Sequence, residues 1–363
     1  MDFVDNAFSN GRFVILANDV FLDERLKAAL PEEIQQFYSE LSPTGRFDLE
    51  AENINIFNAD DGEKYLDFAG TIRFKDCSFG SSGTIMGLDG VVTAKGLYKS
   101  SEGFCDGQVF VATEKLRIKG KSLSRLRADI SYDHNRHSWS TRSLIADCYD
   151  GRLAGNFEMS QRDDGTLEYV LEMGFDDIDL GQFLLARAEA IENSDDSRTT
   201  TGTMDGMLSV SGQVGDSSQH IGRCTLQITD MKVAKVSPLA KLLDVLKLTE
   251  PKDFVFEQML IDSYIKHNRL FFKQVDLSGR TVAFNGSGWM DLRDQSLDLT
   301  LTARGRRGAG AEPSVLQSLT EGLGSAIVRM EVTGNVHDPV ITTRTLPVIK
   351  DTLDILGTRP AKR

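Results

Sequence analysis

The sequence predicts a mainly β fold, a long antiparallel meander forming an elongated, curved or groove-like sheet with a few short amphipathic helices. Short runs alternate apolar and polar residues with a period of two, and Gly, Asp and Asn clusters separate these runs. In the runs 297–301 and 328–332, every second residue is Leu, Val or Met. Each run should therefore place its apolar side chains on one face of a sheet and its polar side chains on the other.

Similar runs recur along most of the chain, and turn signals such as Asp60-Asp61-Gly62 and His267-Asn268 fall between them. The further expected strands are Gly11–Val20, Gly45–Ile56, Tyr65–Lys75, Gly90–Tyr98, Gly107–Ile118, Leu126–Tyr132, Ser138–Ile145, Arg152–Met159, Leu167–Met173, Thr203–Ser211, Gly222–Ile228, Phe254–Lys266, Arg269–Ser278 and Thr281–Leu292.

Helical patterns interrupt the strands in five places. The expected helices are Asp23–Leu41 with a break at Pro31, Leu180–Glu192, a segment opened by Ser237-Pro238, Pro313–Leu323 and Leu346–Leu356. The polar stretch 193–202 (NSDDSRTTTG) is the expected linker. The chain is thus divided into a β-rich segment 1–192 with an N-terminal helical insertion, the linker 193–202, a C-terminal β region 203–345, and a helix and tail 346–363.

Composition and charge exclude one class of function. The 363 residues carry a net charge of -13, and phosphate-backbone binding needs a concentrated excess of Lys and Arg. We therefore expect no nucleic-acid partner. The basic cluster Arg304, Arg306 and Arg307 stands among glycines, so it is interpreted as a solvated loop, with contact to anionic lipid headgroups as the alternative.

Candidate chemistry is sparse. The four cysteines form no C-x-x-C pair, so small buried side chains are favoured, and one or two disulfides stay open. His134-x-x-His137 lies in an expected turn, where this spacing does not bring both rings to one metal. No nucleophile–base motif is recognisable. The prediction is a non-enzymatic protein with no catalytic residue, no metal and no cofactor.

Targeting signals are not visible. Met1–Asp5 has neither a basic region nor an apolar run typical of a signal peptide, and no stretch of about 18 apolar residues predicts a membrane span. Taken literally, the sequence is that of a cytosolic chain. If it is a piece of a longer protein, its N-terminus carries no information about export.

The segment 202–341 resembles the carboxy-terminal region of AsmA-like bacterial envelope proteins, the group that includes TamB and YhdP relatives. The resemblance rests on a series of short motifs: Gly206–Gly212 (GMLSVSG), Gly222–Ile228 (GRCTLQI), the Ser237-Pro238 helix start, Gly286–Leu292 (GSGWMDL), Leu297–Leu301 (LDLTL) and Val332–Val336 (VTGNV) followed by Asp338-Pro339.

The resemblance implies a groove-like β-sheet with an apolar interior, tethered to the inner membrane in a full-length parent and reaching across the periplasm. It also implies a role in moving phospholipid or another acyl lipid towards the outer membrane, together with possible envelope protein partners. This sequence departs from the group in showing no anchor and in having four cysteines.

An apolar sheet face must be covered by a second sheet, a helix or a ligand, and an acyl chain is one such ligand. The candidate lipid-lining residues are Leu208, Val210, Leu226, Ile228, Val275, Leu277, Val282, Phe284, Leu297, Leu299, Leu301, Val328, Met330 and Val332.

Each of these residues has an ordinary sealed core as its alternative. For the whole chain, the alternative function is a structural or assembly module of the envelope that binds a protein partner, for example by adding a strand at an open edge. A hydrolase or carbohydrate-binding β protein is a third hypothesis, and it would need a concave polar or aromatic cluster although only two tryptophans are available.

Overall fold

The computed structural model confirms the mainly β antiparallel meander. It describes residues 2–4, 7–30, 35, 38–39, 41–58, 62–80, 84–162, 164–185, 201–232, 255–279, 282–305, 327–336 and 338–346. These residues divide into two compact units. Unit 1 contains residues 1–194 and 204–222, and unit 2 contains residues 195–203 and 223–363.

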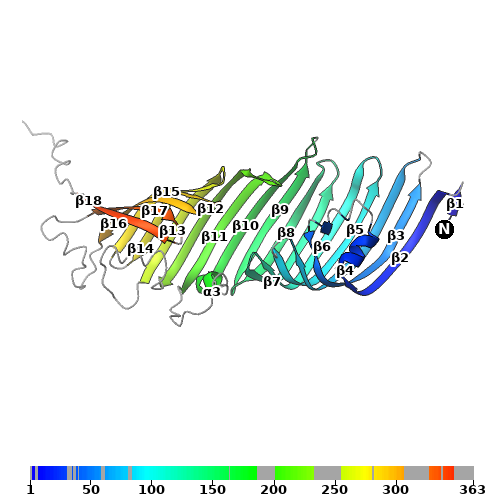
Figure 1. Cartoon of the computed structure of the whole chain (residues 1–363), viewed down its shortest axis with the longest axis horizontal. Coiled ribbons are helices and arrows are strands. Elements are labelled where there is room, and N and C mark those ends of the chain that lie inside the picture. Colours follow the sequence, from blue (N-terminus) through cyan, green and yellow to red (C-terminus); the bar gives the residue numbers. More distant parts are fainter. Residues whose placement is uncertain are drawn as a thin grey trace, which may run out of the picture. The chain divides into compact units, whose positions relative to one another are not determined.

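Unit 1 is a sheet in which each strand pairs antiparallel with the next one along the chain (Figure 1). Its strands are β1 (Asp2–Val4), β2 (Ala7–Phe21), β3 (Thr44–Asn58), β4 (Lys64–Phe79), β5 (Ile85–Lys99), β6 (Gly103–Ile118), β7 (Lys121–Asp133), β8 (Ser138–Cys148), β9 (Gly151–Gln161) and β10 (Leu167–Asp179). Most of β11 (Thr201–Gln213) and the first part of β12 (Asp216–Lys232) also belong to it.

Unit 2 contains the rest of β12 together with β13 (Val255–Lys266), β14 (Arg269–Gly279), β15 (Val282–Asp291), β16 (Ser296–Gly305), β17 (Ile327–Asn335) and β18 (Asp338–Leu346). From β13 to β18, consecutive strands pair antiparallel.

Two short helices are described, α1 (Glu24–Ala29) and α3 (Leu180–Leu185). Asp23 caps α1, because its Oδ1 accepts the N–H groups of Arg25 and Leu26 at 2.9 and 3.0 Å. In the described part of the chain, neither helix has the length and hydropathy needed to cross a bilayer. The other expected helices and the linker residues 193–200 lie outside the described residues, apart from Leu346, which ends β18.

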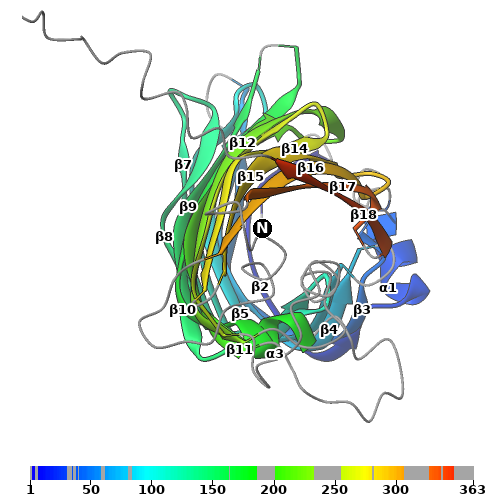
Figure 2. The same ribbon diagram turned by 90° about the vertical axis from the view of Figure 1, so that its left-hand side faces the viewer.

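The strands of unit 1 are long and curved (Figure 2), and bulges near one end of the sheet contribute to this shape. Asp19, Asp76 and Asp177 have positive φ angles of 55°, 50° and 55°, a left-handed conformation that Asp tolerates better than most residues. The pairing register shifts at Asp19 and Asp76. We call this end of the sheet, where β2, β4 and β10 finish, the aspartate edge.

Each of these three aspartates is held by the strand that follows. The N–H groups of Asp19, Asp76 and Asp177 donate to Oδ1 of Asp48, Asp89 and Asp205, each at 2.8 Å. The extra residue at each bulge reverses which of the following residues point to each face of the sheet. Consequently Cys77 and Ile178, which directly follow two of the bulged aspartates, are 0% and 1% exposed.

A glycine on the preceding strand makes room for the bulge of β10. A Cβ atom added to Gly151 would clash with the carbonyl oxygen of Asp176 and would lie 2.5 Å from the carbonyl carbon of Asp177. Both are backbone atoms, so they cannot move aside as a flexible side chain would.

We predict that Gly151→Ala lowers the free energy of unfolding by about 1–3 kcal/mol, because the methyl group forces β9 and β10 apart. Gly174→Ala is the matched control, since its added Cβ would meet no atom closer than 3.7 Å. Its effect should stay within about 0.5 kcal/mol. Urea unfolding of both variants measures the difference, and equal losses would contradict a close approach at Gly151.

Candidate functional site

One face of unit 1 is apolar from β2 to β10. A single row of directly paired residues crosses the nine strands β2–β10, and none of its side chains is polar. In strand order the row is Ala17, Leu49, Ile72, Val92, Val111, Ala128, Leu144, Gly155 and Met173. We call the side of the sheet that carries this row the apolar face.

The next residues along the strands point to the opposite face and are mostly polar. The corresponding row there contains Leu16, Glu50, Thr71, Thr93, Phe110, Asp129 and Ser143. The two sides of the same strands therefore differ sharply in polarity.

Most of the apolar face in unit 1 is neither sealed nor fully open. Eight of the nine row residues are half-buried, and only Ala128 is buried, at 5% exposed. The large buried side chains of unit 1, such as Leu116 and Ile178, lie towards the aspartate edge. With nine strands spaced about 4.8 Å apart, the apolar strip is roughly 40 Å wide.

The predicted lipid-lining residues lie mainly in unit 2. One face of β14–β17 brings together several of them in two pairing rows: Leu277, Phe284, Ala303 and Val328, and then Val275, Gly286, Leu301 and Met330. Leu299 pairs with Val332, and Leu297 pairs with Gly334. Of Val282, only the backbone pairing with Gly305 is described.

The remaining candidates lie on other strands. Leu208 and Val210 are half-buried on β11 in unit 1, and Leu226 and Ile228 lie on β12 in unit 2. Burial divides the candidates into two groups. Eight are buried, namely Ile228, Leu277, Phe284, Leu297, Leu301, Val328, Met330 and Val332, while Leu208, Val210, Leu226, Val275 and Leu299 are half-buried.

The sequence interpretation placed no candidate on β2–β10, where the half-buried apolar face is largest. Glycines interrupt the alternation there, because Gly70, Gly90, Gly96, Gly107 and Gly155 occupy positions on the apolar face. An alternation pattern in which glycine is counted as apolar would have revealed this face in the sequence.

Two threonines also lie on the apolar face. Thr113 is 6% exposed, and its hydroxyl makes no hydrogen bond. Thr141 is 8% exposed, but its Oγ1 accepts the N–H of Phe157 at 2.6 Å. A buried hydroxyl without a partner costs stability, whereas a bonded one contributes to it.

Carboxylates at the aspartate edge form ion pairs with lysines of neighbouring strands. Asp48 accepts from Lys75 at 2.7 Å as well as from the Asp19 N–H, and these bonds hold the pKa of Asp48 below its ordinary value. The pKa of Asp89 is lowered in the same way, first by the N–H of Asp76 and then by Lys115, which lies 3.1 Å from Asp89 Oδ2.

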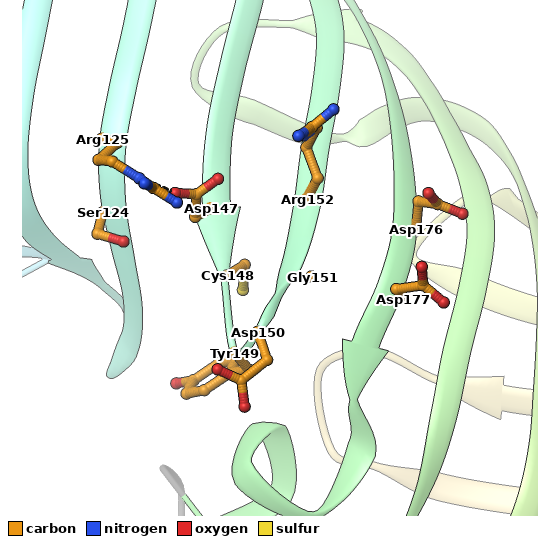
Figure 3. Close-up of a pocket in the computed structure, with 10 residues that line it drawn as sticks. All are labelled: Ser124, Arg125, Asp147, Cys148, Tyr149, Asp150, Gly151, Arg152, Asp176 and Asp177. Atoms are coloured by element: carbon orange, nitrogen blue, oxygen red, sulfur yellow. Dashed lines mark hydrogen bonds and ion pairs between the residues drawn. The ribbon is translucent and has the colours of Figure 1, made fainter.

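A shallow polar pocket at this edge is lined by residues of β7–β10 (Figure 3). Arg125 of β7 reaches across to Asp147 of β8, and Cys148 is the last residue of β8. Burial raises the pKa of the Cys148 thiol to about 11, so the thiol is protonated at neutral pH. All four cysteines are free thiols.

Carboxylate oxygens of Asp176, Asp177 and Asp205 lie within 4.8 Å of one another, an arrangement that could hold a cation. Asp205 already accepts the N–H of the bulged Asp177, so the fold itself accounts for its position.

His134 and His137 also have partners within the fold. Their Nδ1 atoms lie 3.3 Å from the carbonyl oxygen of Phe104 and 3.2 Å from the Tyr132 hydroxyl, respectively.

The basic cluster is only partly described. Arg304 is exposed near the end of β16, while Arg306 and Arg307 lie outside the described residues.

Comparison with known protein families, curated proteins and solved structures finds no match to this chain.

We predict that Thr113→Val raises the free energy of unfolding by about 1 kcal/mol, because it replaces an unbonded buried hydroxyl with a methyl group. Thr141→Val should lower it by about 1–2 kcal/mol, because the Phe157 N–H then loses its acceptor. Chemical denaturation of the two variants provides the comparison. A loss of stability in Thr113→Val would mean that its hydroxyl has a stabilising partner.

Acid should weaken the aspartate edge. Because the folded-state pKa of Asp89 is depressed, its stabilising contribution is complete above the unfolded pKa of about 3.9 and is lost as the pH falls through the folded value. The Asp89→Asn variant should be less stable than wild type at neutral pH, and acidification should lower its stability by a smaller amount. Thermal midpoints between neutral pH and about pH 3 test this, and an unchanged acid dependence in the variant would contradict it.

Proposed function

We propose that this protein is a non-enzymatic binder of acyl lipid, and that the apolar face of unit 1 holds the acyl chains. The observation that supports this most directly is the row of nine apolar residues across β2–β10, most of them half-buried. Apolar surface of this extent has a free-energy cost in water, and contact with a ligand removes that cost.

An acyl chain fits this face better than a folded partner does. It makes no directional contacts, so it needs no polar group on the surface that receives it, and each buried methylene contributes about 0.8 kcal/mol. A protein interface of similar size usually includes hydrogen bonds, at about one per 100–200 Å². Row positions such as Val92, Val111 and Leu144 offer no side-chain donor or acceptor.

The resemblance to AsmA-like envelope proteins supports a more specific form of the same proposal. In that form, the chain shelters or conducts phospholipid between the inner and outer membranes, in the periplasm, as part of a parent that is tethered to the inner membrane. The motifs for the resemblance lie in 202–341, whereas the half-buried apolar face lies mainly in 10–175. The two arguments are therefore independent.

A protein partner is the second candidate, and β2 supports it. Within unit 1, β2 pairs with β1 only through Ala7, Phe8 and Asn10, and its later residues pair on one side, with β3. Val14, Leu16 and Phe21 are 62%, 69% and 58% exposed. A strand of a partner could add to this edge and cover these side chains.

We predict that the chain purified from a bacterial host carries phospholipid, detected by native mass spectrometry and lipid extraction. The double variant Ile72→Asn/Val111→Asn places two amides on the apolar face, so it should bind lipid at least about tenfold more weakly. The matched control is Thr71→Asn/Phe110→Asn, which changes the preceding residues on the opposite face and should retain its lipid.

Both double variants must first show cooperative unfolding. These positions suit the test better than Met330, which is 0% exposed and would leave a buried polar group if changed. Equal lipid loss in the two variants, or a folded wild-type chain free of lipid, contradicts binding at the apolar face. A lipid-free chain would favour strand addition at β2.

A further inference from the structure

The apolar face of unit 1 changes in character along the strands. Near the ends of β5 and β7 and the starts of β6 and β8 it carries the rings of Tyr98, Phe104, Tyr132 and Trp139, which we call the ring cluster. The Phe104 centroid lies 5.5 Å from that of Tyr98 and 5.4 Å from that of Trp139, and the Tyr132 and Trp139 centroids are 5.1 Å apart. Tyr and Trp combine an apolar ring with a polar group, a combination suited to a boundary between apolar and wet surroundings.

Polar groups stand beside the ring cluster in the turn between β7 and β8. The Tyr132 hydroxyl lies 3.2 Å from Nδ1 of His137, and the Arg136 side chain is 74% exposed. Asp133 fixes the turn, because its Oδ1 accepts the N–H groups of Asn135 and Arg136 at 3.0 and 3.3 Å. Arg136 therefore brings an exposed cation to the turn that follows Tyr132, and the His137 ring contacts the ring cluster directly.

Two other charged side chains near the ring cluster, Lys99 and Glu102, already pair with each other. Lys99 contacts Glu102 at 2.7 Å, and Glu102 lies 3.9 Å from Nε2 of His134. The Arg136–Asp133 contact is long, at 3.8 Å, and the side chains of Arg136 and Asp133 are 74% and 45% exposed. Arg136 can therefore turn to an anion at little cost.

At the opposite end of the same strands, several apolar side chains are deeply buried. At the aspartate edge, Leu116, Ala146 and Cys148 are 7%, 3% and 5% exposed, whereas Tyr98 in the ring cluster is 39% exposed. A polar headgroup seated over these buried apolar side chains would lose its hydration, whereas beside the exposed Tyr98 ring it would keep it. Along the strands, the apolar face thus passes from an end with polar groups to an end with buried apolar side chains, much as a lipid passes from headgroup to acyl chains.

We propose that the ring cluster and the 133–137 turn hold the phosphate-bearing headgroup of a bound phospholipid, with its acyl chains extending from there towards the aspartate edge. Arg136 supplies a charged donor to the phosphate, His137 supplies a second donor, and the rings of Tyr132 and Trp139 lie at the boundary between head and tail. This rests on the proposed function, which concerns only the acyl chains.

Trp139 offers a direct test, because the chain has two tryptophans and the other, Trp289, is in unit 2. In a Trp289→Phe chain loaded with phosphatidylglycerol, all tryptophan emission comes from Trp139. Lipids brominated close to the headgroup should quench this emission more than lipids brominated at the ends of the acyl chains. Stronger quenching by the terminal bromines would overturn the proposed orientation and leave acyl-chain binding intact.

A paired ligand test separates head from tail. Arg136→Gln/His137→Gln should weaken binding of phosphatidylglycerol about tenfold. Binding of diacylglycerol with the same chains should be unchanged, because that lipid lacks the phosphate. Arg142→Gln, an exposed site on β8, is the control and should bind both lipids as wild type does.

The outcomes distinguish the two proposals. An equal change for the two lipids, or no change for either, overturns the headgroup site while acyl-chain binding stands. Failure of the wild-type chain to bind either lipid overturns both proposals.

Discussion

Backbone pairing between long neighbouring strands fixes which side chains share a face, and the other features of this protein depend on that register. In unit 1, Leu49 pairs with Ile72, Ile72 with Val92 and Val92 with Val111, and the same row continues to Met173. A slip of one residue would bring polar positions such as Thr71 and Thr93 to the apolar side. The sheet therefore keeps its two-sided character only while every pair stays in register.

The bulged aspartates are compatible with this register because they lie at one edge of the sheet. Each bulge reverses the alternation, but it does so after the strand has contributed its residue to the apolar row. The interstrand bond from the Asp76 N–H to Asp89 restores a partner to a backbone group that the bulge removes from the regular pairing. The buried Cys77 that follows helps to close this edge. Local backbone chemistry thus buries side chains of the apolar face at the aspartate edge.

The two units use similar strands in different ways. In unit 2, Leu301 and Met330 pair across β16 and β17 and are 5% and 0% exposed, so their face is covered. In unit 1, Ile72 and Val111 occupy equivalent positions in a meander but remain half-buried. Alternation in the sequence is the same in both cases, because it reports the polarity of a strand's two sides and not what covers them. For this reason the predicted lipid-lining residues fell mainly in the unit whose apolar face is buried.

The sequence by itself determined the class of fold and the position of most strands. Runs such as Gly45–Ile56 and Arg152–Met159 fall inside β3 and β9, because period-two alternation and turn residues are local properties. Only the tertiary structure decided the register, the bulges at Asp19, Asp76 and Asp177, and the joining of Tyr98, Phe104, Tyr132 and Trp139 into one cluster. Register and burial depend on pairing between strands. Glycines such as Gly96 and Gly107 interrupt the apolar alternation in the sequence, although in the fold they leave room for the rings of the apolar face. These long-range contacts leave no local pattern that the sequence alone could reveal.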